Sequence, residues 1–153
     1  MTTHKVNNQD VNGETSISSW IRNGINPTAI GYAEEFGKWL AYNKLTTTQI
    51  RNVYGEVKRI QMRGYTSSFE SDLLLLKPKL AYAKARKTSG GTVAAASAEA
   101  LQKVLTKGID AIFLLPEGVN EEKQKEIKLS QFETFASLFE AILSYHRAFD
   151  GKI

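Results

Sequence analysis

The chain of 153 residues contains no cysteine. It therefore cannot form disulfides, bind a metal through thiolates or use a cysteine nucleophile. Its only histidines are His4, in a polar N-terminal stretch, and His146, within an apolar pattern where a packed structural role is expected. No HExxH motif and no phosphate-binding glycine loop with its lysine occurs. We therefore expect no enzymatic activity, no metal site and no cofactor.

Long apolar runs are also missing, and none approaches the ~20 residues that a membrane-spanning helix needs. The N-terminal segment 1–18 is rich in Asn, Thr and Ser, and it lacks the apolar centre of a signal peptide. We expect residues 1–18 to form a flexible polar tail and residues 19–153 to form a single helical-bundle domain. The expected setting is the cytoplasm.

Sustained alternation of polar and apolar residues, the pattern of a strand, is absent, whereas helical spacing recurs along the chain. The sequence therefore predicts an all-α fold, a compact bundle of about five helices. We expect a break or kink at Pro78, because proline lacks the N–H group and clashes with the preceding turn. A second break is expected near Ser130. The expected helices span residues 28–43, 47–62, 67–76 continuing as 78–87, 94–114 and 120–150.

Three helix starts carry the pattern of a capping box, in which a Ser or Thr is followed three residues later by Glu or Gln. These pairs are Thr46 with Gln49, Ser67 with Glu70, and Ser130 with Glu133. The first pair begins the expected helix 47–62, which lies in the basic region of the chain.

Positive charge is concentrated in one region of the chain, residues 46–87. That region has nine Lys or Arg and three acids, a local charge of +6, whereas the remaining residues carry −2 and the whole chain +4. A localised basic patch favours a polyanionic partner, because phosphates attract it and release counterions on binding.

In the expected helix 47–62, the apolar residues Ile50, Val57 and Ile60 fall on one face. Arg51 and Lys58 lie on the opposite face. This arrangement favours phosphate binding, but a helix must also present polar residues to water, so a solvated surface stays open as the alternative. The candidate phosphate-binding residues are Arg51, Lys58, Arg59, Arg63, Lys77, Lys79 and Arg86.

No module that reads bases is recognisable, since zinc-finger, KH and RNP signatures are all missing. Tyr54 and Tyr65 are candidates for stacking on a base, although packing between helices is the commoner role of such tyrosines. The expected contacts are therefore with the nucleic-acid backbone, independent of sequence.

Three blocks of sequence resemble the Csm small subunit of type III-A CRISPR effector complexes. They are TTTQIRNVYGEVKRIQ (46–61), LLLLKPKLAYAKAR (73–86) and FETFASLFEAILSYHRAFDGK (132–152). Their order and spacing fit that family, and the resemblance covers about residues 28–152.

The resemblance implies a small all-α protein without catalytic activity that serves in antiviral defence. Such subunits stack in several copies within a ribonucleoprotein, beside the repeating backbone subunits and against the large polymerase-like subunit. They line the channel for the CRISPR RNA and its target RNA. The alternative function is a helical protein-interaction module whose basic face docks an acidic protein.

Overall fold

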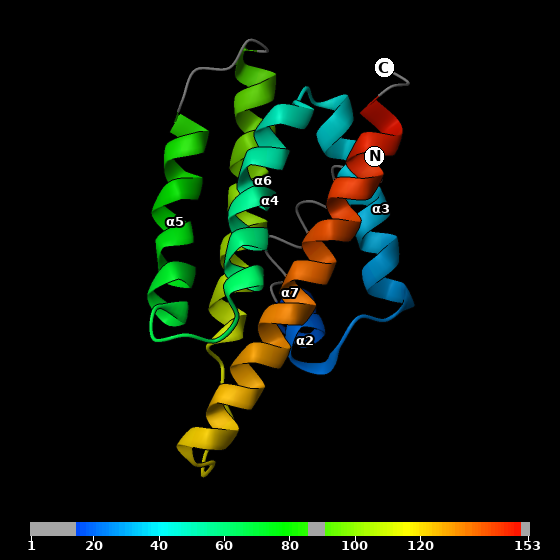
Figure 1. The fold of residues 1–153 in the computed structure, drawn as a ribbon. Coiled ribbons are helices and arrows are strands. Elements are labelled where there is room, and N and C mark those ends of the chain that lie inside the picture. Colours follow the sequence, from blue (N-terminus) through cyan, green and yellow to red (C-terminus); the bar gives the residue numbers. More distant parts are fainter. Residues whose placement is uncertain (1–14, 86–90, 151–153) are drawn as a thin grey trace.

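The computed structural model describes residues 15–85 and 91–150. Within these residues the chain forms helices and no strand, which confirms the all-α prediction, but there are six helices rather than about five. They form a bundle (Figure 1). The helices are α2 (Thr15–Asn23), α3 (Pro27–Tyr42), α4 (Thr47–Arg63), α5 (Phe69–Ala85), α6 (Gly91–Ile112) and α7 (Glu121–Asp150).

The additional helix is α2, which begins inside the stretch expected to be a tail. Its residues Ile17, Trp20 and Ile21 are buried, and the Trp20 ring lies 5.4 Å from that of Tyr32 on α3. Trp20 and Ile21 follow Ile17 by three and four positions, and this spacing places all three residues on one face of the helix. Helix α2 thus includes residues 15–18 of the expected tail; residues 1–14 are outside the described part of the chain.

Helix α7 forms the centre of the bundle and contacts α2, α3, α4 and α6. Phe132, Phe135 and Phe139 from this helix are almost fully buried in the core. The backbones of α3 and α7 approach closely at Gly37. A Cβ added there would lie 2.8 Å from the carbonyl oxygen of Ile142, so only glycine fits this contact.

The expected breaks do not occur, because α5 runs through Pro78 and α7 runs through Ser130. A kink at Pro78 stays a prediction. Leu76 and Leu80 are buried on either side of Pro78. The packing of both residues holds the helix across the proline despite the lost hydrogen bond.

The connection between α6 and α7 extends beyond the ends of the other helices (Figure 1). The buried Gln131 amide fixes its base, since Nε2 donates hydrogen bonds to the carbonyls of Ala111 (3.2 Å), Ile112 (2.7 Å) and Leu114 (3.2 Å). Carbonyls at the end of a helix lack helical partners, and this side chain satisfies them. We call the segment 113–127 the α6–α7 tip.

His146 is fully buried and holds the end of α7 against the connection between α3 and α4. Its Nε2 lies 2.6 Å from the carbonyl oxygen of Leu45. Since a carbonyl only accepts, Nε2 carries the proton in this contact. The packed structural role predicted for His146 is confirmed. In the described part of the chain, no helix has the length and apolar character required to cross a membrane.

Candidate nucleic-acid interface

The predicted capping box at the start of α4 is present. The Thr46 side chain accepts a hydrogen bond from the Gln49 N–H (3.1 Å), and the Gln49 side chain accepts one from the Thr46 N–H (3.0 Å). The helix ends at Gly64, whose φ of 74° suits glycine. These features at both ends fix the limits of the helix that carries the basic face.

The capping box predicted at Ser67 and Glu70 is not formed. Thr66 and Ser68 hold the first turn of α5 instead, since the Asp72 N–H donates to the Ser68 carbonyl (2.8 Å) and the Phe69 N–H donates to the Thr66 carbonyl (3.1 Å). The Glu70 carboxylate pairs with Lys128 on α7.

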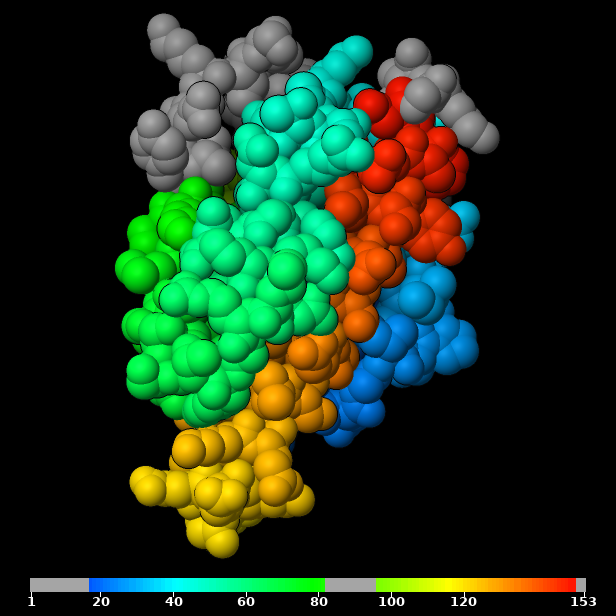
Figure 2. Space-filling model, in the orientation of Figure 1, coloured from blue at the N-terminus to red at the C-terminus, as the bar shows by residue number. Residues whose placement is uncertain are grey.

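Helix α4 buries one face and exposes the other, as the sequence predicted. Ile50, Val57 and Ile60 are buried against the core. Figure 2 shows the opposite side of α4 uncovered, with α5 along one border and α7 along the other. We call this side the α4 face, and its exposed residues in line along the helix are Arg51, Gly55, Lys58 and Met62.

Arg51 and Lys58 are the cations of this face that carry no ion pair to any described residue. Both side chains are exposed. The ammonium of Lys58 lies 5.9 Å from the centre of the Tyr54 ring, a distance at which a cation–π interaction orients the lysine without neutralising it. Both charges are therefore available to an anion.

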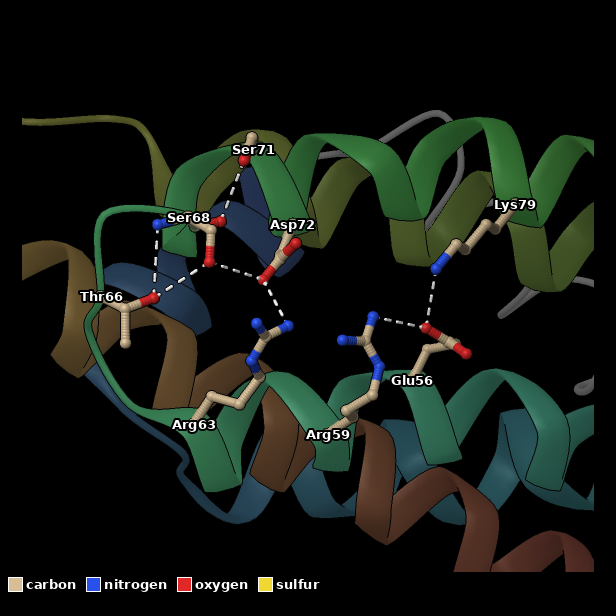
Figure 3. Close-up of polar contacts among 8 residues, drawn as sticks. All are labelled: Glu56, Arg59, Arg63, Thr66, Ser68, Ser71, Asp72 and Lys79. Carbon is tan, nitrogen blue, oxygen red and sulfur yellow. Dashed lines mark hydrogen bonds and ion pairs between the residues drawn. The ribbon is translucent and has the colours of Figure 1, made fainter.

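Arg59 and Lys79 converge on a single carboxylate oxygen. Glu56 Oε1 accepts from Arg59 Nη2 at 2.9 Å and from Lys79 Nζ at 2.8 Å, so this carboxylate joins α4 to α5 (Figure 3). The hydrogen bond from Lys79, followed by that from Arg59, holds the pKa of Glu56 below its usual range. Glu56 therefore stays ionised at neutral pH and offsets part of the charge of its two partners.

Two further candidates are paired with acids from other helices. Arg63 Nη1 lies 3.4 Å from Asp72 Oδ2 on α5 (Figure 3). Lys77 pairs with Asp110 on α6. The seventh candidate, Arg86, lies outside the described residues. The structure thus places six candidates on α4 and α5 but leaves only Arg51 and Lys58 without an acidic partner within its described part.

The two candidate stacking tyrosines are used in packing. The Tyr54 ring meets Phe139 edge to face at 5.4 Å, and the Tyr65 ring stacks on Phe69 at 4.6 Å. Burial, followed by the nearby Glu140 carboxylate, raises the pKa of Tyr54. These contacts favour the packing role that the sequence left open.

A hollow of about 200 Å³ lies between α4 and α5 and is lined mainly by apolar atoms. Its lining residues are Asn52, Val53, Glu56, Leu76, Lys79 and Leu80. Ligand pockets usually measure about 300–1,000 Å³, so this hollow is small for a substrate site. Across residues 15–85 and 91–150, no cluster of three or more His, Asp or Glu has a geometry suited to a metal ion.

Sequence reasoning missed three features that lie on or beside the α4 face. The link of Arg59 and Lys79 through Glu56 depends on how α5 packs, which no local pattern reveals. Met62 is 84% exposed, and its helical position, nearly in line with Arg51, could have shown this. Gly55 lies between Arg51 and Lys58, and its helix-breaking tendency was a signal in the sequence itself.

Comparison with known proteins identifies the family of the chain. A family model described as Csm2 Type III-A matches residues 27–152, which include α3 to α7 and every candidate residue. Searches of curated proteins and of solved structures found no match. The matched segment covers most of the chain, so the chain belongs to the Csm2 family, the small subunits of type III-A CRISPR effector complexes.

Proposed function

We propose that this subunit is a non-catalytic scaffold of a cytoplasmic ribonucleoprotein in antiviral defence, which binds the backbones of guide and target RNA through the α4 face. The observation that carries the proposal is the pair of exposed cations, Arg51 and Lys58, about two turns apart on one capped helix. Neither has an acidic partner among the described residues. Exposed cations of this kind contact phosphates without reading sequence.

The other candidates have a secondary role in this proposal. Arg59, Lys79, Arg63 and Lys77 each hold a carboxylate, so a phosphate must compete with that acid before it gains their charge. Exposed ion pairs contribute only about 0–1 kcal/mol, which makes the exchange feasible but weakens its net gain.

Protein partners are expected on a different surface. Leu74 and Leu75 on α5 are 48% and 53% exposed, and apolar side chains next to each other favour contact with another protein. Family membership supports partners within the Csm complex. The partners we propose are the repeating backbone subunits, the large polymerase-like subunit and further copies of this chain along the filament.

The experiment removes the two unpaired charges together. Complex reconstituted with subunit carrying Arg51→Ala and Lys58→Ala is titrated with a target RNA over a range of salt concentrations. Loss of two phosphate contacts should lower the log–log salt slope by about 1.4, since each contact to a single strand contributes about 0.7.

A matched control removes the same charge elsewhere. Arg22→Ala with Lys123→Ala takes one Arg and one Lys from exposed positions on α2 and α7. This control should leave both affinity and salt slope unchanged. If the two double variants behave alike, RNA binding by the α4 face is wrong, and docking of an acidic protein becomes the better interpretation.

A further inference from the structure

Gly55 lies in the middle of α4 and is exposed. Glycine is unfavourable in a helix interior, because the unfolded chain has more conformational freedom to lose and no side chain compensates. A glycine in a helix can be required by the conformation of the backbone or by a close neighbour.

The folded chain supplies neither reason. The backbone at Gly55 is helical, and a Cβ added there would meet no atom within 4 Å. Gly108 on α6 shows the contrast, because an added Cβ would lie 2.7 Å from the ring of Phe135. The absence of a side chain at Gly55 therefore serves nothing in the described part of the molecule.

The position of Gly55 indicates what approaches it. Positions three and four apart along a helix share one side of it, so Gly55 faces the same way as Arg51 and Lys58, one turn from each. It is thus a gap in the side-chain cover, bordered along the helix by two cations that have no acidic partner among the described residues.

We propose that Gly55 is the point of closest approach of an RNA strand, where ribose and phosphate lie in van der Waals contact with the α4 backbone. Arg51 and Lys58 then bind the phosphates on either side. A polyanion suits this gap better than a protein helix, because its borders are cationic rather than apolar. The inference rests on the proposed RNA-binding function and adds the place where the strand crosses α4.

The test compares Gly55 with a second exposed helical glycine. Gly31 on α3 also has no atom within 4 Å of an added Cβ, but Glu34 and Glu35 rather than cations follow one turn later. Gly31→Ala and Gly55→Ala should each raise the melting temperature of the pure chain by about 2–4 °C, because alanine favours the helix.

The two glycines should differ in RNA binding by the reconstituted complex. Gly55→Ala should weaken binding, and Gly55→Leu should weaken it by about fivefold or more, because the larger side chain holds the strand away from both cations. Gly31→Ala and Gly31→Leu should bind as the natural chain does. Both alanine variants should thus be more stable, but only Gly55→Ala should also lose affinity for RNA. Misfolding cannot produce a loss of affinity together with a gain in stability.

The possible outcomes distinguish the closest approach at Gly55 from the proposed RNA binding by the α4 face. If both Gly55 variants bind RNA normally while the Arg51→Ala, Lys58→Ala double variant is weakened, the closest approach is elsewhere and RNA binding by α4 stands. If the double variant binds normally and Gly55→Leu is weakened, RNA binding by the two cations is wrong, and the larger side chain disturbs a contact other than the one proposed. Normal binding by all of them overturns both proposals.

Discussion

A single carboxylate, Glu56, pairs with two cations of the basic region. It holds Arg59 and Lys79 on one oxygen, whereas Arg51 and Lys58 are left without an acid among the described residues. The charge presented to a partner is therefore smaller than the sum of the basic residues. A substitution of Glu56 alone can therefore change the charge that the basic region presents.

Removing that carboxylate should strengthen RNA binding. In Glu56→Gln the side chain keeps its size but releases both cations, so the affinity of the reconstituted complex should rise by up to about fivefold. The measurement is an RNA titration at low and at physiological salt, and the gain should be larger at low salt.

Glu126→Gln is the matched control. Glu126 Oε1 lies 3.5 Å from Lys123 Nζ at the α6–α7 tip, and the loss of this carboxylate changes the net charge equally. An equal gain in both variants would mean that net charge alone matters and that Glu56 has no local role.

The outward direction of Arg51 and Lys58 was predictable from the sequence, because positions within one helix are related by a fixed angle. Their lack of partners was not predictable. Lys77 shows why: its partner Asp110 lies far along the chain, on another helix. Such a pairing depends on how two helices pack, so spacing along the chain cannot distinguish Lys77 from Lys58.

At the scale of helices, local signals succeeded where nothing in the tertiary structure opposed them. The capping box of α4 formed as predicted. The breaks at Pro78 and Ser130 failed because buried residues on both sides keep each helix continuous, and the packing energy of those side chains exceeds the local cost. Helix α2 was overlooked because the polar residues around Ile17 and Trp20 obscure its short apolar spacing.

The link between α5 and α7 should depend on pH through Glu70. Its carboxylate pairs with Lys128, whose side chain is only 11% exposed, and accepts from the Tyr65 hydroxyl at 3.1 Å. The hydrogen bond from Lys128 is the largest cause that holds the pKa of Glu70 below its ordinary value of 4.5. The unfolded chain therefore binds this proton more readily than the folded one, and the stabilisation is present above the ordinary pKa and lost as the pH falls through the folded value.

Glu70→Gln should thus lower the free energy of unfolding at neutral pH by about 1 kcal/mol, a modest figure because Glu70 is half exposed. The difference from the natural chain should shrink as the pH falls below the ordinary pKa of a glutamate. Urea denaturation at several pH values measures it. A difference that is the same at neutral and acid pH would show that ionisation of Glu70 contributes nothing.

At the scale of the whole molecule, the small area of the α4 face limits what one subunit can do alone. A few phosphate contacts give weak non-specific binding, typically ~10⁻⁴ to 10⁻⁶ M at physiological salt. When several copies are held along one strand, later contacts become intramolecular, and the avidity can rise by ~10² to 10⁴.

We therefore expect the isolated subunit to bind RNA weakly and to contribute strongly within the assembly. An RNA of fixed length is titrated with the lone subunit, with the complete complex and with complex assembled without the subunit. Equal affinity of the lone subunit and the complete complex would contradict this expectation. So would a complex whose target affinity and stability are unchanged when the subunit is omitted.

Glu121, on the α6–α7 tip, lies far from the middle of the α4 face. Phe139 packs against Tyr54 of α4, and Glu121 is the first residue of the same helix, α7. About five turns of about 5.4 Å separate Glu121 from Phe139, a distance of about 27 Å along the helix. This is more than three times the Debye length of about 8 Å at physiological ionic strength. Salt therefore screens the charge of Glu121 before it reaches RNA at the middle of α4, and this residue can vary with the needs of a neighbouring surface while the potential around Tyr54 stays the same.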